Sequence, residues 1–164
     1  MNHATSGKTN MKRQLRRPER GMTEPDAWKL LESGEYGILS TCGPDGEPYG
    51  LPINYSVSNG ALYFHCAVEG HKLENIAAES RVSFCVVGKT EVLPDQFATR
   101  YESVIVSGRA AEVFGDEKQL AMEGLLSKYS TGFHEKGLRY IAAQGGQTRM
   151  FRVGIDTICG KARR

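Results

Sequence analysis

Apolar residues recur with two different periods along the chain, and the period predicts where helices and strands lie. From Thr23, a residue type that often caps helices, to Gly34, apolar positions recur three and four residues apart, as on one face of a helix. The same kind of spacing occurs in three later windows, residues 71–79, 116–128 and 138–143. We therefore expect four helices.

Six other segments have strand-like patterns, in which apolar and polar residues alternate or a short apolar run stands between turn signals. They are residues 35–42, 49–57, 61–66, 82–87, 101–114 and 150–158. Turns at residues 43–46 and 58–60 join the first three segments as hairpins, because Gly and Asn accept the backbone angles of tight turns. The order of elements lacks the strand–helix alternation of a parallel sheet. It predicts a mainly β fold, a six-stranded antiparallel β-barrel with flanking helices.

Length and composition narrow the class of protein. The chain has 164 residues, of which 40% are hydrophobic and 24% charged, as in a single folded domain of ordinary composition. We expect residues 1–21 to be a flexible basic leader and residues 22–164 to be this domain. No apolar run approaches the ~18 residues of a membrane helix, and the polar N-terminus lacks the apolar core of a secretion signal. We therefore expect a cytoplasmic protein without membrane association.

The charge is uneven along the chain. The first 20 residues hold six of the 21 Lys and Arg residues and one of the 19 Asp and Glu residues, so the other 144 have a net charge of −3. We therefore expect no dedicated nucleic-acid binding, and a leader that is solvated or packs on a partner subunit. A regulatory role in which the leader contacts nucleic acid is the weaker alternative. Neither the cysteines nor the histidines have the spacing of a metal site, and cysteines without such pairs suit a reducing compartment.

The segment that most clearly indicates chemistry is residues 63–76. A strand ends there, a short loop containing Gly70 follows, and a helix opens with His71 and Lys72. The first turn of a helix leaves backbone N–H groups free and its dipole favours an anion, so a lysine and a histidine at this point suit a phosphate. The alternative is an ordinary helix start with an exposed lysine. His65, on the preceding strand, is interpreted as a ligand-binding residue or as a hydrogen-bonded structural residue.

Two further groups have structural interpretations. Tyr129, Phe133 and Tyr140 recur at or near helical spacing, and we expect them in the core. The polar stretch before the long strand at residues 101–114 is either a functional cluster or a surface salt bridge between Arg100 and Glu102.

Taken together, these segments resemble the FMN-binding split-barrel superfamily that includes pyridoxamine phosphate oxidase. Within it, the chain is most similar to the nitroimidazole-resistance (Nim-type) reductases. The resemblance covers about residues 11–163. It rests on motifs in the same order along the chain, at residues 11–22, 34–41, 43–55, 63–72, 91–94, 99–104 and 160–163.

The resemblance implies a split barrel that forms a homodimer, with FMN in clefts at the subunit interface. The phosphate-binding positions that it implies are His65, Cys66, His71 and Lys72. The isoalloxazine ring would lie along Leu51, Pro52, Ile53 and Asn54, with Ser40 and Thr41 nearby. Ser103 is expected to reach the flavin. His71, whose counterpart lies close to the flavin in the Nim-type branch, is the candidate catalytic residue.

Departures from the family pattern refine this expectation. The chain ends in residues 160–164 where the oxidase has an Arg-Leu-x-Pro type terminus, and His71 replaces an arginine of its phosphate loop. We therefore do not expect oxidation of pyridoxamine phosphate, and FAD could replace FMN. The resemblance implies an NAD(P)H-dependent reductase of nitroaromatic or quinone-like acceptors. The alternative is a non-catalytic split barrel that binds flavin or haem, with His65 or His71 as an axial haem ligand.

Overall fold

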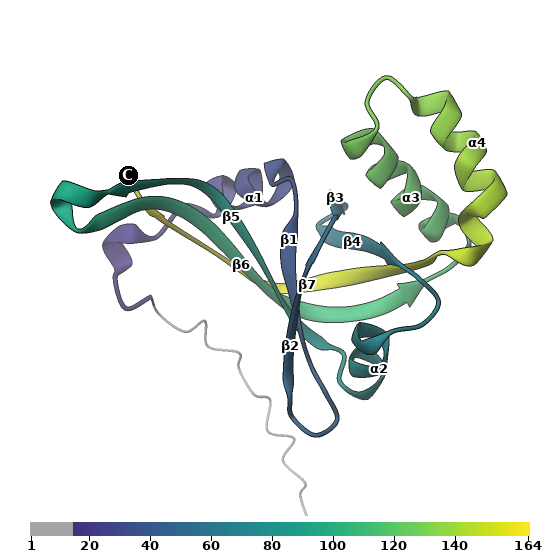
Figure 1. Cartoon of the computed structure of the whole chain (residues 1–164), viewed down its shortest axis with the longest axis horizontal. Helices are drawn as coiled ribbons and strands as arrows, with labels where there is room; N and C mark the ends of the chain where they lie inside the picture. The colour runs from purple at the N-terminus through teal and green to yellow at the C-terminus, as the bar shows by residue number, and fades with distance from the viewer. Residues whose placement is uncertain (1–14) are drawn as a thin grey trace, which may run out of the picture.

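Seven strands of one antiparallel sheet form the centre of the molecule (Figure 1). The computed structural model describes residues 15–164. The strands are β1 (Gly37–Cys42), β2 (Pro48–Ile53), β3 (Ser56–Ser58), β4 (Ala61–Cys66), β5 (Arg81–Leu93), β6 (Ala98–Val113) and β7 (Arg149–Arg163). The α-helices are α1 (Glu24–Ser33), α2 (His71–Ala78), α3 (Gly115–Tyr129) and α4 (His134–Gln144). Short 3-10 helices are η1 (Pro18–Arg20), η2 (Pro94–Gln96) and η3 (Gly145–Gln147).

The order of strands in the sheet is β2-β1-β5-β6-β7-β4-β3, so the two edge strands, β2 and β3, follow each other directly along the chain. The sheet therefore curls until its edges approach, without a ladder of hydrogen bonds between them. This arrangement is an antiparallel split barrel with flanking helices, and it confirms the predicted fold class.

The described residues contain seven strands, whereas six were predicted. The predicted strand at residues 49–57 is divided, because β2 pairs with β1 and β3 pairs with β4. Between them Tyr55 turns its side chain into the core and donates its hydroxyl to the carbonyl of Leu31. The N–H of Tyr55 donates to the hydroxyl of Tyr129 at 3.0 Å. These bonds give Tyr55 partners outside the ladder, and the strand breaks there.

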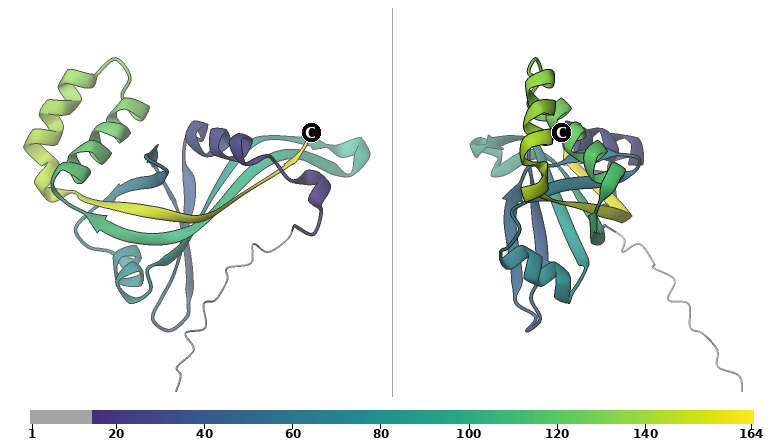
Figure 2. Two further views of the ribbon diagram at one scale, coloured as in Figure 1. Left: turned by 180° about the vertical axis from the view of Figure 1, so that it is seen from behind. Right: turned by 90° about the vertical axis from the view of Figure 1, so that its right-hand side faces the viewer.

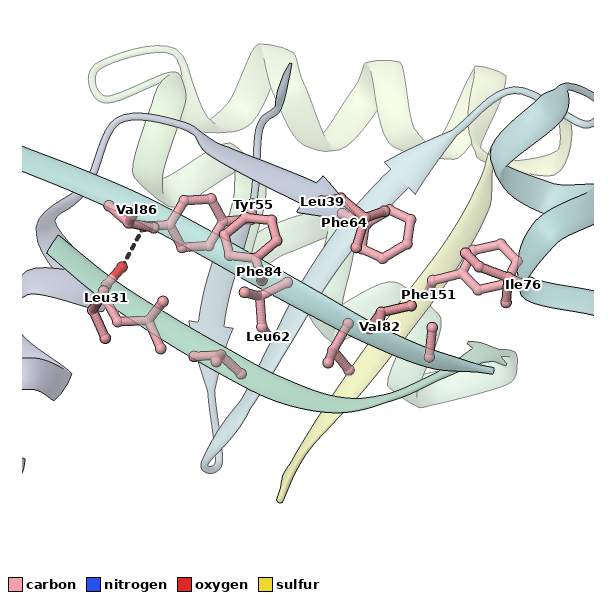
Figure 3. Packing of buried hydrophobic residues seen from close by; sticks show 14 of the residues in the cluster. Leu31, Leu39, Tyr55, Leu62, Phe64, Ile76, Val82, Phe84, Val86 and Phe151 are labelled. Atoms are coloured by element: carbon pink, nitrogen blue, oxygen red, sulfur yellow. Dashed lines mark hydrogen bonds between the residues drawn. The ribbon is translucent and has the colours of Figure 1, made fainter. Parts of the chain in front are cut away.

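The core lies inside the curl of the sheet (Figure 3). Tyr55 packs edge-on against Phe84, with ring centroids 4.8 Å apart, and Phe64 stacks on Phe151 at 5.5 Å. Helix α1 closes the core from the side of β6 and β7, and α2 packs against β1. The predicted cap of α1 is confirmed, since the N–H of Asp26 donates to the hydroxyl of Thr23 at 3.3 Å.

The outer face of the sheet carries two contrasting rows of side chains, which continue across β2, β1, β5, β6 and β7. One row is mainly apolar: Pro52, Ile38, Cys85, Ile105 and Cys159. The next row is small and mostly hydroxylated: Gly50, Ser40, Ser83, Ser107 and Thr157. We call these two rows the outer face. Ile105 is 49% exposed, so the apolar row is open to solvent in the single chain.

The far halves of β5 and β6 form a long hairpin arm at one end of the molecule, and α3 and α4 lie side by side at the other end (Figure 2). Of the predicted leader, residues 1–14 lie outside the described residues, so its boundary stays a prediction. Gly21 forms a bridge to Lys161 on β7. Within residues 15–164, no helix combines the length and the apolar character needed to cross a bilayer.

Candidate functional site

The gap between the two edges of the sheet forms the centre of the candidate site. Strand β2 pairs only with β1 among the described strands, and β4 pairs with β3 only from Ala61 to Tyr63. The later part of β4 therefore has an open edge, and edge strands offer unpaired backbone N–H and C=O groups. A hollow of about 640 Å³ joins the end of β2 to β4 and includes Pro52, Ile53, Asn54 and His65 in its lining.

The start of α2 lies at the other end of β2. The rings of Tyr49 and His71 pack with centroids 4.3 Å apart and planes tilted by 38°. Strand β2 therefore runs from a contact with the first residue of α2 to the hollow beside His65. We call this arrangement, with β2 on one side and β4 and the start of α2 on the other, the split groove.

The start of α2 has the features of an anion site. Gly70 precedes the helix with φ of 135°, a conformation that side-chain-bearing residues rarely adopt, and nothing lies within 4 Å of the position that a Cβ would take. The helix then begins at His71, which is exposed, and at Lys72, which is half-buried. Glu74 also lies in the first turn and partly offsets the positive charge. The helix dipole and Lys72 together favour a negatively charged group near Gly70.

The positive charge of Lys72 affects the pKa values of His65 and Cys66. Partial burial and the positive charge of Lys72 lower the pKa of His65, so its imidazole is neutral at neutral pH. Burial raises the pKa of the Cys66 thiol, and Lys72 and Arg149 only partly oppose this effect. The groove therefore contains a neutral imidazole, whereas the Cys66 thiol is protonated and belongs to the buried core behind it. Such a thiol is not a reactive nucleophile.

An ion pair holds the loop before α2 in place. Arg149 on β7 forms two hydrogen bonds with the carboxylate of Glu112 on β6, at 2.9 and 2.5 Å. Its third nitrogen donates to the carbonyl of Val68 at 3.4 Å. Arg149 therefore ties the loop that leads to Lys72 to two strands of the sheet. The sequence does not indicate this pair, because its two residues lie 37 positions apart and neither belongs to a recognisable motif.

The structure brings some of the predicted site residues together and separates others. Those that line the hollow are Pro52, Ile53, Asn54 and His65. Lys72 lies close enough to His65 and to Cys66 for its charge to lower the pKa of both. Leu51 packs against the core, and Thr41 is buried, where its hydroxyl accepts from the amide of Asn75 at 3.0 Å. These two residues support the groove from inside.

Ser40 and Ser103 lie apart from the hollow. Ser40 belongs to the hydroxylated row of the outer face, and Ser103 pairs with Val87 and Lys161 farther along the same face of the sheet. Within one chain, Ser103 is therefore not a neighbour of His65.

One expectation from sequence, and one of the alternatives that it left open, are wrong. Phe133 and Tyr140 are 65% and 69% exposed and do not belong to the core. Tyr140 lies on α4, none of whose residues is buried, and Phe133 directly precedes that helix. Only Tyr129 packs against buried residues. Arg100 pairs with Glu91, at 2.9 Å, and not with Glu102, because the antiparallel register sets Arg100 directly opposite Glu91.

Comparison with known proteins decides the family. The family model described as pyridoxamine 5'-phosphate oxidase matches residues 23–162. The chain belongs to this family. The resemblance seen in the sequence is thereby confirmed, and the family is one of flavin-binding split barrels. A search of curated proteins found no match.

Solved structures share the fold. A candidate 5-nitroimidazole antibiotic resistance protein from Bacteroides thetaiotaomicron is 18% identical, with a TM-score of 0.71 over 87% of this chain and 86% of that one. A FAD-binding protein from Mesorhizobium loti is 24% identical, with a TM-score of 0.67 over 88% and 98%. The flavocytochrome Anf3 from Azotobacter vinelandii is 16% identical, with a TM-score of 0.76 over 92% and 72%. At these identities the likeness concerns the fold.

Proposed function

We propose that this chain binds FMN or FAD in the split groove and acts as an NAD(P)H-dependent reductase of small nitroaromatic or quinone-like acceptors. The observation that carries the proposal is the groove itself. It has Lys72 and the start of α2 at one end, the neutral His65 farther along, and the edge of β2 as a wall. The FAD-binding protein and the flavocytochrome that share the fold support a flavin as the ligand.

The residues of the groove fit a flavin. Lys72, His71 and the free N–H groups beside Gly70 form a donor set for a phosphate. Pro52 and Ile53 offer apolar surface for a ring system, and the unpaired backbone groups of β2 suit a ring that carries both donors and acceptors. The volume of the hollow lies in the usual range for small-molecule sites. We assign His65 to the phosphate side and Asn54 to the ring, while the core-facing Cys66, Leu51 and Thr41 support the groove from inside and Ser40 lies on the outer face.

A bound flavin would supply hydride and electron transfer, and the chain would bind it, orient it and place protons near it. His71 is the candidate catalytic residue. Its ring is exposed and held against Tyr49, and an imidazole has one nitrogen that can donate a proton and one that can accept it. The neutral His65 can accept a hydrogen bond from a ligand in the hollow.

A homodimer would complete the site. The apolar row of the outer face is open to solvent in one chain, and exposed apolar patches of this kind mark interaction surfaces. Ser103 lies on that face but away from its own groove. A second copy packed on the outer face would bring Ser103 toward the partner's flavin. We propose a cytoplasmic location for this dimer.

A second candidate function is binding of haem, or of flavin without turnover. The lowered pKa of His65 favours the neutral imidazole that an axial ligand requires, and the flavocytochrome shows that the fold is compatible with both groups.

The absorption spectrum of the purified protein, with the released chromophore identified by mass, tests the proposal. A flavin band near ~450 nm is expected, whereas a Soret band near ~400 nm would favour haem. Lys72→Ala is expected to weaken flavin binding at least about tenfold, as the loss of a charged hydrogen bond does. The control is Lys29→Ala on α1, whose side chain is highly exposed. A colourless protein that takes up neither flavin nor haem would overturn the proposal.

A further inference from the structure

A second cavity, of about 510 Å³, lies between the α3–α4 hairpin and the barrel. We call it the helical cleft. Its walls are mainly apolar or aromatic and include Leu126, Tyr129, Phe133, Tyr140 and Ile141. Figures 1 and 2 show the hairpin standing beyond β3 and β4, at the end opposite the β5–β6 arm. The split groove described above does not use these aromatic residues.

Helix α4 has an apolar face that the chain itself does not bury. None of its residues is buried, yet Tyr140 and Ile141 line the cleft, and Phe133 stands directly before the helix. Large exposed aromatic side chains gathered in a concavity are typical of a ligand site. Contact between apolar surface and water is unfavourable in free energy, and a ligand that covers the surface removes this contact.

The far wall of the cleft is firmly held. The Tyr129 hydroxyl donates to the carbonyl of Glu35 at 2.6 Å and accepts from the N–H of Tyr55 at 3.0 Å. The ammonium group of Lys128 lies over the ring of Tyr55, 3.8 Å from its centroid. These contacts fix the end of α3 to the break between β2 and β3. The cleft therefore has a constant position relative to the split groove.

The helical cleft and the hollow of the split groove share two lining residues, Asn54 and His65. A molecule in the cleft would therefore lie beside the polar groups that face the proposed flavin. Among the described residues that line the cleft, Lys136 is the only one with a full charge at neutral pH, since His65 is neutral. The surroundings thus combine flat apolar surface, one cation and neutral polar groups, which are Asn54, His65, Ser130, Gln144 and Thr148.

We propose that the helical cleft binds the organic substrate, and that this substrate is a flat aromatic molecule with one anionic group. Its ring packs among Tyr129, Tyr140 and Ile141, its anionic group lies toward Lys136, and its reactive end reaches Asn54 and His65. This inference rests on the proposed function, because it assigns the substrate of the same site. It adds a location and a chemical class.

Two fluorescent dyes test the location and the charge preference separately. Anilinonaphthalene sulfonate is aromatic and anionic, and phenylnaphthylamine is a neutral dye of similar shape. Titration of the full chain should show saturable binding of both dyes, with one site per protomer. Ile141→Trp, which fills the cleft, is expected to weaken both dyes at least about tenfold. Lys136→Met is expected to weaken the sulfonate several-fold and to leave the neutral dye unchanged.

Matched variants keep the result interpretable. Leu120→Trp places the same side chain at an exposed position of α3 that does not line the cleft, and it should bind both dyes as the wild type does. Tyr140→Ala removes one wall of the cleft without filling it and should also weaken both dyes. Thermal unfolding and flavin content per protomer show whether each variant is folded and loaded.

Unchanged dye binding in Ile141→Trp, or equal weakening in Leu120→Trp, would overturn the proposal. The proposal would also be overturned if the dyes bound a monomeric variant and did not bind the wild-type dimer. A second copy of the chain would then cover the cleft. If the protein binds flavin but Ile141→Trp does not weaken dye binding, the proposal of a substrate site in the helical cleft fails and the proposed function stands. If the dyes behave as expected and no flavin binds, the proposed function fails and the cleft remains a ligand site.

Discussion

Tyr49 and His71 are in direct ring contact, with centroids 4.3 Å apart, although one lies on an edge strand and the other opens a helix. The contact fixes the distance between β2 and the start of α2. A ligand that uses both walls of the split groove therefore meets them in a preset arrangement, which lowers the ordering cost of binding.

Removing this ring contact should weaken flavin binding while the charges stay the same. We expect Tyr49→Ala to raise the flavin dissociation constant about fivefold, in line with about 1 kcal/mol for an aromatic pair. Tyr49→Phe keeps the ring and should bind as the wild type does. Fluorescence titration of flavin-free protein measures both. If Tyr49→Phe weakens binding as much as Tyr49→Ala, the hydroxyl and not the ring contact is responsible.

The pKa of His65 should lie below 6.5 in the flavin-free protein, because partial burial and Lys72 both disfavour the imidazolium. Lys72→Met should raise this pKa and leave it below 6.5, since burial is the larger cause. As the pH falls through 6.5, the unfolded chain takes up this proton first, so His65 lowers the free energy of unfolding until the folded pKa is passed. NMR titration of the imidazole measures the pKa, and a wild-type value of 6.5 or more would contradict the expectation.

The ion pair of Glu112 and Arg149 should contribute to stability. Glu112→Gln is expected to lower the free energy of unfolding by about 1 kcal/mol at neutral pH, because the pair is bidentate and partly buried. Arg149 lowers the pKa of Glu112 below 4.5, so the contribution is complete above 4.5 and disappears as the pH falls through the lowered pKa.

A matched control for this pair is Glu91→Gln. It breaks the pair with Arg100, which has a similar distance but is half exposed, and it should change stability by only a few tenths of a kcal/mol. Urea denaturation at two pH values compares the variants. If both variants lost the same free energy of unfolding, the burial of Glu112 would make no difference to the strength of its ion pair. Glu112→Gln should also weaken flavin binding, because Arg149 holds the loop before Lys72.

The outer face should carry the dimer contact. Ile105→Lys places a charge in the apolar row and is expected to shift the protein from dimer to monomer in analytical ultracentrifugation. Leu120→Lys, at an exposed position on α3, should leave the dimer intact. A wild-type protein that stays monomeric at every concentration, or a dimer that tolerates Ile105→Lys, would place the contact elsewhere or exclude it.

Local patterns were sufficient for much of the fold. The cap at Thr23, the turn at residues 58–60 and the helix that opens with His71 depend on residues a few positions apart, and each is present in the structure. Asn59 and Gly60, for example, both have positive φ. The break at Tyr55 was beyond such reasoning, because it depends on Tyr129, 74 positions away.

The candidate site divides in the same way. His65 and Lys72 are close in sequence, and their relation follows from one strand, one loop and one helix. The contact of Tyr49 with His71 depends on how a strand meets a helix, and the pair of Glu112 with Arg149 depends on how two strands pair. Phe133 and Tyr140 were misplaced in the core because helical spacing indicates an apolar face and does not say whether the chain itself covers that face.

Asn54 and Tyr55 are the only residues between the strands at the two edges of the sheet. Every ladder of hydrogen bonds in the sheet lies outside this pair, so residues inserted after Asn54 would alter the spacing of the edges and leave each register unchanged. Tyr129 would still hold the start of β3. In proteins that share this sheet, a longer or shorter linker between β2 and β3 would change the width of the gap between the sheet edges. Ligands of different thickness would then fit without any substitution in the core.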